Sequence, residues 1–294
     1  MISITWDSVL YYSPLVIVTL IAMFKTSFNP FKRILFRSTT NIHTSSDIKL
    51  TKMSLPNAIE SRRPKQSPEF DYSTLSNYKD FTLNHTTLNL DINFDSKKII
   101  GNVIYDLTRL NNTDSIHLDT SHLVIKSIDI DGIANDSFHL KDRVEPLGSK
   151  LIIDTPTLSK PDFQLKLNFE TTEKCTALQW LSPKQTSSKP YVFSQLEAIH
   201  ARSLFPAFDT PSVKSTFTAN IRSPLPVVFS GISADSKTDG LYQFEQKIPI
   251  PAYLVGIASG DLVTASIGTR STDYTEPIPI KDAQWEFDGD VENF

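Results

Sequence analysis

Apolar and polar residues alternate in several stretches of this sequence, and this period of two limits the fold more than any other feature. Between residues 88 and 94 every second position is apolar: Leu88, Leu90, Ile92 and Phe94. Side chains two positions apart share one face of an extended strand, so the pattern predicts a strand with one buried and one solvated face. Similar stretches occur at residues 103–107, 123–130, 151–153, 163–169 and 217–221. The chain is therefore expected to form many short strands.

Turn residues separate the expected strands. The pairs Asp131-Gly132, Pro161-Asp162 and Asp239-Gly240 favour tight turns, and a further turn is expected over residues 96–101. No helical period, heptad pattern or longer internal repeat competes with this pattern. Residues 78–270 are therefore predicted to form one all-β, antiparallel, sandwich-like domain.

The pattern changes toward the C-terminus. The run at residues 248–262 has Pro249 and Pro251 before its apolar part, which favours entry into a buried strand over a helix. After residue 280, Asp282 is an acid that can cap a new helix. Residues 271–294 are therefore predicted to be a linker and the first residues of another domain.

The first 52 residues differ from the rest and are predicted to be a targeting-like or alternative-start extension. An apolar run at residues 9–24 is shorter than the ~20 residues that span a bilayer and contains Pro14, so stable membrane insertion is not expected. Up to residue 46 three interpretations stay open: a mitochondrial presequence, a signal-like segment, or an extension read only from an upstream start, with Met53 as the alternative initiator. Residues 53–77, which contain three prolines, are predicted to be an extended lead-in.

Composition limits the partners and the compartment. The 39% of hydrophobic residues suffice for a buried core, and a net charge of -4 does not fit a nucleic-acid-binding surface. The one cysteine, Cys175, is predicted to be a core-facing residue, and its use fits a reducing compartment. The cytoplasm, and with it the nucleus, is the expected location unless the first 46 residues direct the chain elsewhere. Glycosylation triplets at Asn84, Asn111 and Asn135 do not by themselves imply secretion.

The sequence lacks the residues of a complete catalytic metal site. None of the six histidines belongs to a His-Glu-x-x-His pair, and neither a Gly-rich phosphate loop nor a Gly-x-Ser-x-Gly motif occurs. His117 and His122 flank Asp119, but the residues between them are interpreted as a turn and both histidines as surface or edge residues. His200 is expected to be packed or hydrogen-bonded. This chain is therefore expected to bind no metal.

The strongest functional signal lies in one stretch, PYVFSQLEAIHARSLFPAFDTPS, at residues 190–212. Residues 191–193 predict a strand, and residues 195–198 are interpreted as its continuation. The two prolines within residues 205–211 predict a shaped loop instead of a helix. A carboxylate among apolar neighbours needs a partner, so Glu197 pairs with Arg202, faces solvent, or binds a ligand.

Within this stretch, Q-x-E-A-x-x-A-R-x-x-F-P-x-F-D-x-P resembles the signature of the N-terminal domain of gluzincin zinc aminopeptidases. The motifs KCTALQWL at residues 174–181 and KIPIPAYLVGIASGDL at residues 247–262 are similar to the leukotriene A-4 hydrolase branch, most closely its fungal leucine aminopeptidases. The resemblance extends from about residue 56 to the C-terminus. It implies a saddle-like β domain, followed near Asp273 by an α-helical catalytic domain that holds the zinc and is mostly missing from this chain.

The resemblance also implies roles for particular residues. The segment Gln195, Leu196, Glu197, Ala198 matches the motif in which polar side chains help to hold the free amino terminus of a peptide, so these four residues are the predicted substrate-binding site. This chain has Glu197 where the vertebrate leukotriene hydrolases carry glutamine, which favours peptidase over epoxide hydrolase activity.

Three further residues are expected to be structural. Arg202 and Asp209 flank the proline-containing loop and are expected to fix its shape through a charge-assisted contact. Trp180 is predicted to lie in the core.

Three functions remain open from the sequence. The first is the N-terminal, substrate-anchoring portion of a zinc metalloaminopeptidase, inactive without its catalytic domain in cis. The second is a non-catalytic β-sandwich binding module that acts alone. The third is a membrane-anchored adhesion-type domain, suggested by the apolar run at residues 9–24 and the three glycosylation triplets.

Overall fold

The computed structural model describes residues 69–155, 160–234, 239–269 and 271–288, and the predictions for residues 1–52 lie outside this part of the chain. The described residues form mostly β-strands, which confirms the predicted fold class. The strands are β1 Phe81–Asn93, β2 Lys98–Arg109, β3 Ser115–Thr120, β4 Leu123–Ile130, β5 Ile133–Ala134, β6 Phe138–Leu140, β7 Ser149–Asp154, β8 Asp162–Thr171, β9 Leu178–Leu181, β10 Tyr191–Ser194, β11 Ser215–Arg222, β12 Val227–Phe229, β13 Ile232–Ser233, β14 Leu241–Ile250, β15 Ile257–Ser259, β16 Val263–Ser266 and β17 Thr272–Thr275. The helical segments are η2 Tyr78–Asp80, α3 Ala201–Leu204, η3 Ala252–Leu254 and α4 Ile280–Asp288.

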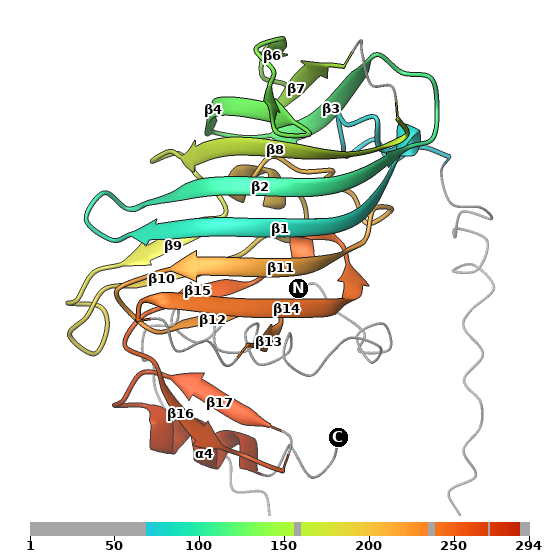
Figure 1. The fold of residues 1–294 in the computed structure, drawn as a ribbon. Helices are drawn as coiled ribbons and strands as arrows, with labels where there is room; N and C mark the ends of the chain where they lie inside the picture. The colour runs from blue at the N-terminus through green and yellow to red at the C-terminus, as the bar shows by residue number, and fades with distance from the viewer. Residues whose placement is uncertain (1–68, 156–159, 235–238, 270, 289–294) are drawn as a thin grey trace, which may run out of the picture.

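The described residues form four sheets. The largest has eight strands in the order β13-β14-β11-β1-β2-β8-β4-β5, and a four-stranded sheet, β12-β15-β10-β9, lies behind it in Figure 1. A three-stranded sheet, β3-β7-β6, lies at one end of the large sheet, and the hairpin β16-β17 with α4 lies at the opposite end. In the part of the chain that is described, no helix combines the length and the apolar character needed to cross a membrane.

The core forms where the inner faces of these sheets meet. In β1, β2, β8 and β11, buried residues alternate with more exposed ones, as the period of two predicts. The buried apolar side chains of these four strands are Phe81, Leu88, Leu90, Ile92, Ile99, Val103, Tyr105, Leu107, Phe163, Leu165, Leu167, Phe169, Phe217, Ala219 and Ile221. The alternation therefore identified both the strands and the face that each of them buries.

The opposite face of the large sheet carries a row of amide side chains. Asn220 donates a hydrogen bond to Asn89 over 2.9 Å, and Asn89 donates to Asn102 over 2.8 Å. Gln243 continues the row by donating to Asn220 over 2.8 Å. These residues are direct cross-strand partners on β14, β11, β1 and β2. A shift of one residue would turn every amide inward, so the row favours the observed register.

One strand pairing differs from the predicted, wholly antiparallel arrangement. Strands β1 and β11 are neighbours and run parallel. Parallel neighbours need a long connection, and here the chain passes through β2 to β10 and α3 before it returns. Both strands also begin at the same end of the sheet. The segment before β1 and the segment before β11 are bonded to each other there, because Thr210 donates a 2.6 Å hydrogen bond to Asp71.

The turn predictions hold in part. Asp131 and Gly132 have φ values of 50° and 78°, as expected for the tight hairpin turn between β4 and β5. The turn expected over residues 96–101 is shorter, because β2 already begins at Lys98 and includes Gly101. The glycine was misinterpreted as a turn residue, whereas its role is to allow a close approach between strands.

The helical segments also differ in detail from the sequence predictions. Helix α4 begins at Ile280, so Asp282 lies in its first turn and is not its cap. In the run at residues 248–262, the proline-rich part ends β14 and the chain makes the short helix η3 before it enters the buried strand β15.

Replacing Gly101 by alanine should destabilise the chain. An alanine Cβ there would lie 2.0 Å from the backbone oxygen of Asn89, and neither backbone can move without disturbing the central strand pair. We expect a loss of about 2–3 kcal/mol in the free energy of unfolding, measured by urea denaturation. Gly132→Ala is the control: its Cβ would meet no atom within 4 Å, and only the positive φ of 78° should cost about 1 kcal/mol. Equal losses would contradict this account of Gly101.

Candidate functional site

The predicted substrate-binding segment is a turn and not the continuation of a strand. Strand β10 ends at Ser194, and residues 197–200 are in turn conformation, with a cis peptide bond between Glu197 and Ala198. The backbone N–H of His200 donates to the carbonyl oxygen of Leu196 over 2.8 Å, which closes the turn. The alternation of polar and apolar residues misled the prediction because it reports only which side chains are buried, and a turn with one anchored leucine gives the same pattern.

The turn buries one side chain and exposes its tip. Leu196 is buried in the core, whereas Glu197 and Ala198 are exposed and Gln195 is half-buried. Within the described residues, neither the amide of Gln195 nor the carboxylate of Glu197 has a hydrogen-bond or ion-pair partner. Their polar atoms are therefore free to bind a molecule that approaches the turn.

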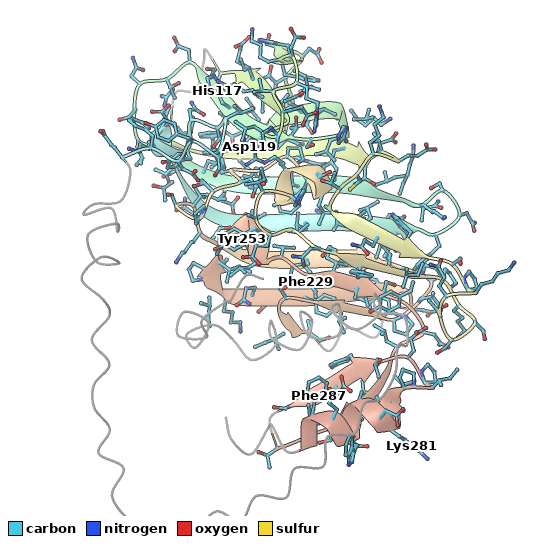
Figure 2. All side chains as sticks on the ribbon, turned by 180° about the vertical axis from the view of Figure 1, so that it is seen from behind. His117, Asp119, Phe229, Tyr253, Lys281 and Phe287 are labelled. Atoms are coloured by element: carbon cyan, nitrogen blue, oxygen red, sulfur yellow. The ribbon has the colours of Figure 1, made fainter. Side chains whose placement is uncertain are left out.

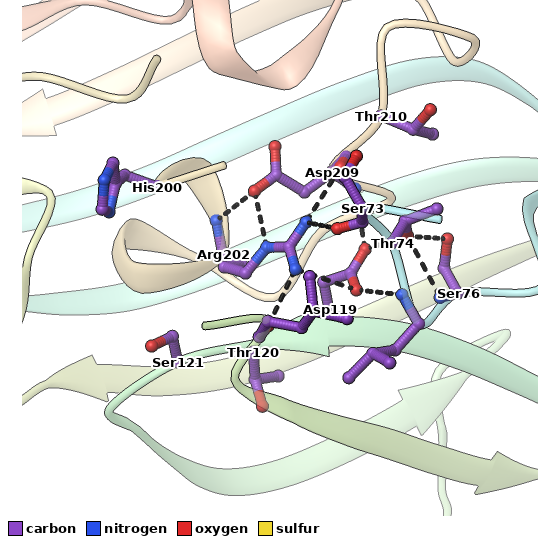
Figure 3. Close-up of polar contacts among 12 residues, drawn as sticks. Ser73, Thr74, Ser76, Asp119, Thr120, Ser121, His200, Arg202, Asp209 and Thr210 are labelled. Carbon is purple, nitrogen blue, oxygen red and sulfur yellow. Dashed lines mark hydrogen bonds and ion pairs between the residues drawn. The ribbon is translucent and has the colours of Figure 1, made fainter. Parts of the chain in front are cut away.

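Arg202 does not pair with Glu197, so that alternative is wrong. Its side chain is 1% exposed and projects from helix α3 toward Asp209, Asp119 and two backbone carbonyls (Figure 3). The guanidinium donates from Nε to Asp209 over 2.9 Å, from Nη1 to the carbonyl of Leu147 over 2.7 Å, and from Nη2 to the carbonyl of Ser73 over 2.8 Å. The predicted charge-assisted contact between Arg202 and Asp209 is thereby confirmed.

Asp119 is the second carboxylate of this buried cluster, and the sequence analysis missed its role. Its Oδ1 lies 3.5 Å from Nη1 of Arg202 and accepts a 2.6 Å hydrogen bond from the backbone N–H of Leu75. Its Oδ2 accepts hydrogen bonds from the hydroxyl of Thr74 and from the backbone N–H of Asp209, the latter at 3.1 Å. No signal in the sequence indicated this role, because Asp119 is in phase with the half-buried Ser115 and His117 of β3 and not with the buried Ile116 and Leu118. Residues 118–121 were interpreted as a turn, whereas β3 continues to Thr120.

The cluster carries an excess of negative charge in a buried place. Two carboxylates surround one guanidinium, and all three side chains are at most 1% exposed. Burial raises the pKa of Asp119 to about 6, although Arg202 and the hydrogen-bond donors oppose this shift. Burial likewise raises the pKa of Asp209, whose Oδ1 has no hydrogen-bond partner among the described residues. A proton on one of the two carboxylates would balance the charge of the cluster.

The proline-containing loop packs directly on this cluster. Phe205, Ala207 and Phe208 are buried, and the backbone of Ala207 exchanges two hydrogen bonds with that of Asp119, 2.8 and 3.0 Å long. The hydroxyl of the buried Tyr105 donates to the carbonyl of Pro206, and burial raises the pKa of this tyrosine well above its ordinary value. The loop is thus shaped by contacts with β2 and β3, far from it in sequence.

The histidines do not form a metal site in the described part of the chain, where no group of three or more His, Cys, Asp or Glu side chains could hold a metal ion. His117 lies on β3 and shares a 3.0 Å hydrogen bond with Ser115, while Asp119 is engaged by Arg202; Figure 2 shows both at the end of the molecule away from α4. Burial and the neighbouring Lys150 lower the pKa of His117. His200 shares a 2.8 Å hydrogen bond with Thr176, which agrees with the hydrogen-bonded role expected for it.

Trp180 and Cys175, both predicted to face the core, are partly buried against it. Trp180 is partly buried against the core and meets the ring of Phe94 edge-on, with the ring centroids 5.8 Å apart. Cys175 is partly buried and its thiol donates to the carbonyl of Ser203 over 3.1 Å. Burial raises the pKa of this thiol, which does not favour a nucleophilic role.

Comparison with known proteins agrees with the resemblance seen in the motifs. Residues 76–254 match the family model of the peptidase M1 N-terminal domain. Leucine aminopeptidase 2 of Saccharomyces cerevisiae is 58% identical over 271 residues, which cover 90% of this chain and 40% of that protein. Leucine aminopeptidase 2 of Vanderwaltozyma polyspora is 58% identical over 248 residues, covering 82% of this chain and 38% of that protein. A solved structure of yeast LTA4 hydrolase with bestatin, at 60% identity and a TM-score of 0.74, covers 81% of this chain and 38% of that chain.

The similarity begins earlier in the chain than the motifs indicated. The chain spans about 40% of the length of the Saccharomyces relative. Because the match covers 90% of this chain, it must include part of the first 52 residues and not begin near residue 56. The domain boundaries at residues 52, 77 and 270 stay predictions.

The raised pKa of Asp119 predicts that the free energy of unfolding depends on pH. The folded chain releases this proton near pH 6, whereas an unfolded chain releases it near the ordinary value of 3.8. Between these values the folded state binds more protons, so the contribution of Asp119 to the free energy of unfolding is full below pH 3.8 and falls as the pH rises through about 6. Over this window the advantage of the wild type over Asp119→Asn should shrink by roughly 3 kcal/mol in urea titrations. Asp142→Asn, at an exposed position, provides the baseline, and a pH-independent difference for Asp119→Asn would contradict the raised pKa.

Proposed function

Since the chain belongs to the peptidase M1 family and corresponds to its N-terminal domain, we propose that it is the substrate-anchoring part of a zinc aminopeptidase that removes residues from the amino ends of peptides. The observation that carries this proposal is the exposed turn at residues 195–198, whose amide and carboxylate have no partner among the described residues. In this proposal Glu197 accepts a hydrogen bond from the α-ammonium of the peptide, and Gln195 lines the adjoining wall.

The chemistry of the turn suits an ammonium group. An exopeptidase must measure one residue from the free amine, and acceptors on a fixed backbone provide such a reference point. A carboxylate attracts the ammonium by charge and hydrogen bond, while an N-acetylated peptide offers neither the charge nor the same donors. Anchoring of Leu196 in the core keeps the acceptors in place before substrate arrives, which lowers the entropic cost of binding.

The zinc of this family does not fit the residues described in this chain. A catalytic zinc site needs three protein ligands and an open position for water, and no such group occurs among the described residues. The metal ligands would therefore come from the rest of the protein, where zinc would activate the attacking water. The contribution of this chain is to bind and orient the amino end of the peptide.

The second candidate is a stand-alone binding module. Large apolar side chains near the C-terminal end of the described chain favour the aminopeptidase proposal, because Ile278 is 80% exposed and Trp285 on α4 is 82% exposed. Apolar surface of this kind is expected to be covered by further protein, which the catalytic domain in cis would supply. We further propose a cytoplasmic location, which fits the single cysteine of the chain. The first 46 residues could direct the chain elsewhere, and mass spectrometry of the native N-terminus would decide whether residues 1–52 are retained.

Glu197→Ala in the full-length protein tests the proposed role of the turn. An ammonium 4 Å from a carboxylate gains about 4 kcal/mol of attraction at an effective dielectric constant near 20, and desolvation offsets part of this gain. We expect a net loss of about 2–3 kcal/mol, so kcat/KM for free-amine aminoacyl-nitroanilides should fall about 30- to 150-fold. The discrimination between free and N-acetylated substrates should shrink at the same time.

Two further variants make this test specific. Glu197→Gln keeps an acceptor and removes the charge, so its loss should be smaller than that of Glu197→Ala. Glu245→Ala removes an exposed carboxylate on β14, which pairs with Lys247 over 3.4 Å, and should leave the kinetics unchanged. Wild-type kinetics for Glu197→Ala would refute the assignment of this turn.

Removal of the rest of the protein gives a separate expectation. This chain alone should hydrolyse no aminoacyl-nitroanilide and should retain no stoichiometric zinc after dialysis, measured by atomic emission. One tightly bound zinc per chain would contradict the assignment of the metal to the rest of the protein.

A further inference from the structure

We infer that Thr176 is a positioning residue for the amine-binding turn, holding its C-terminal end from the solvent side through His200. The inference rests on the proposed function of the turn. It arises from the segment Cys175–Ala177, here called the brace, which precedes β9 and lies along the turn and the start of α3.

The brace contacts both ends of the turn. At the N-terminal end, the backbone N–H of Gln195 donates to the carbonyl of Ala177 over 2.8 Å, continuing the pairing of β9 with β10. At the C-terminal end, the hydroxyl of Thr176 shares a 2.8 Å hydrogen bond with Nδ1 of His200. The two exposed residues of the turn, Glu197 and Ala198, therefore lie between two points held by neighbouring residues of one segment.

The brace is itself attached to α3. The backbone N–H of Thr176 donates to the hydroxyl of Ser203 over 2.9 Å, and the thiol of Cys175 donates to the carbonyl of Ser203 over 3.1 Å. Ser203 in turn donates its backbone N–H to the carbonyl of His200 over 2.9 Å. These bonds give the brace a fixed position from which the hydroxyl of Thr176 can orient the imidazole.

Because Thr176 is exposed, its hydroxyl can be removed to test the orientation of the turn without destabilising the fold. Arg202 holds α3 from the buried side, and its loss would leave two buried carboxylates without their counter-charge. Thr176 is exposed and holds the same region from outside, so removal of its hydroxyl leaves no buried polar group unpaired. A small displacement of Glu197 is enough to weaken binding, because a charge-assisted hydrogen bond depends steeply on distance and angle.

The test uses the full-length protein and the variant Thr176→Val, which keeps the shape of the side chain and removes the hydroxyl. The loss of one hydrogen bond should lower kcat/KM for free-amine aminoacyl-nitroanilides about 2- to 10-fold, mostly through KM, with an unchanged melting temperature. Thr176→Ser, which keeps the hydroxyl, should restore wild-type kinetics. Thr216→Val is the matched control, because Thr216 shares a 2.7 Å hydrogen bond with Nδ1 of His85 on the large sheet, away from the turn.

A double-mutant cycle with Glu197→Ala decides whether Thr176 acts through the turn. If it does, Thr176→Val causes no further loss once Glu197 is absent. A loss that persists in the Glu197→Ala background would overturn the inference, as would wild-type kinetics for Thr176→Val while Glu197→Ala is impaired. Wild-type kinetics for Glu197→Ala itself would overturn the proposed function, and this inference with it.

Discussion

The buried ion cluster of Arg202, Asp119 and Asp209 is the interaction on which the rest of the structure depends. It joins the segment before β1, strand β3 and the loop before β11, which are far apart in sequence. A buried guanidinium is stable only when its donors are satisfied, so these segments must meet at one place. The meeting point also explains the parallel pair in the large sheet, because β1 and β11 both start from segments that the cluster holds together.

The same cluster fixes helix α3, and the exposed turn at residues 195–198 is attached to this fixed helix. Helix α3 carries the buried arginine, and the turn with Glu197 at its tip precedes it directly. The helix is held by buried charges and by the packing of the proline-containing loop, whereas the tip has polar groups without partners among the described residues. A binding group on such a support is oriented before its ligand arrives, which is the arrangement expected of a site that measures from a peptide amine.

The family assignment and the geometry account for different parts of the proposal. Similarity to the leucine aminopeptidases identifies the chain as the N-terminal part of a metalloaminopeptidase. The geometry adds that the matching segment is a turn braced on two sides, from within by Arg202 and from solvent by Thr176. It also separates the residues that hold the fold, such as Asp209, from those left free to bind, such as Glu197.

The sequence by itself determined the long strands of the large sheet, the faces they bury and the family. Alternation reports burial directly, so the inward residues of β1 such as Leu88 were identified, and the motif at residues 195–211 was sufficient to recognise the relatives. Only the tertiary structure decided the partner of Arg202, the role of Asp119 and the brace at Thr176. Alternation cannot distinguish a strand from a turn with one buried leucine, and no local pattern shows which distant carboxylate lies beside a buried arginine. Those choices depend on contacts between segments that meet only when the chain has folded.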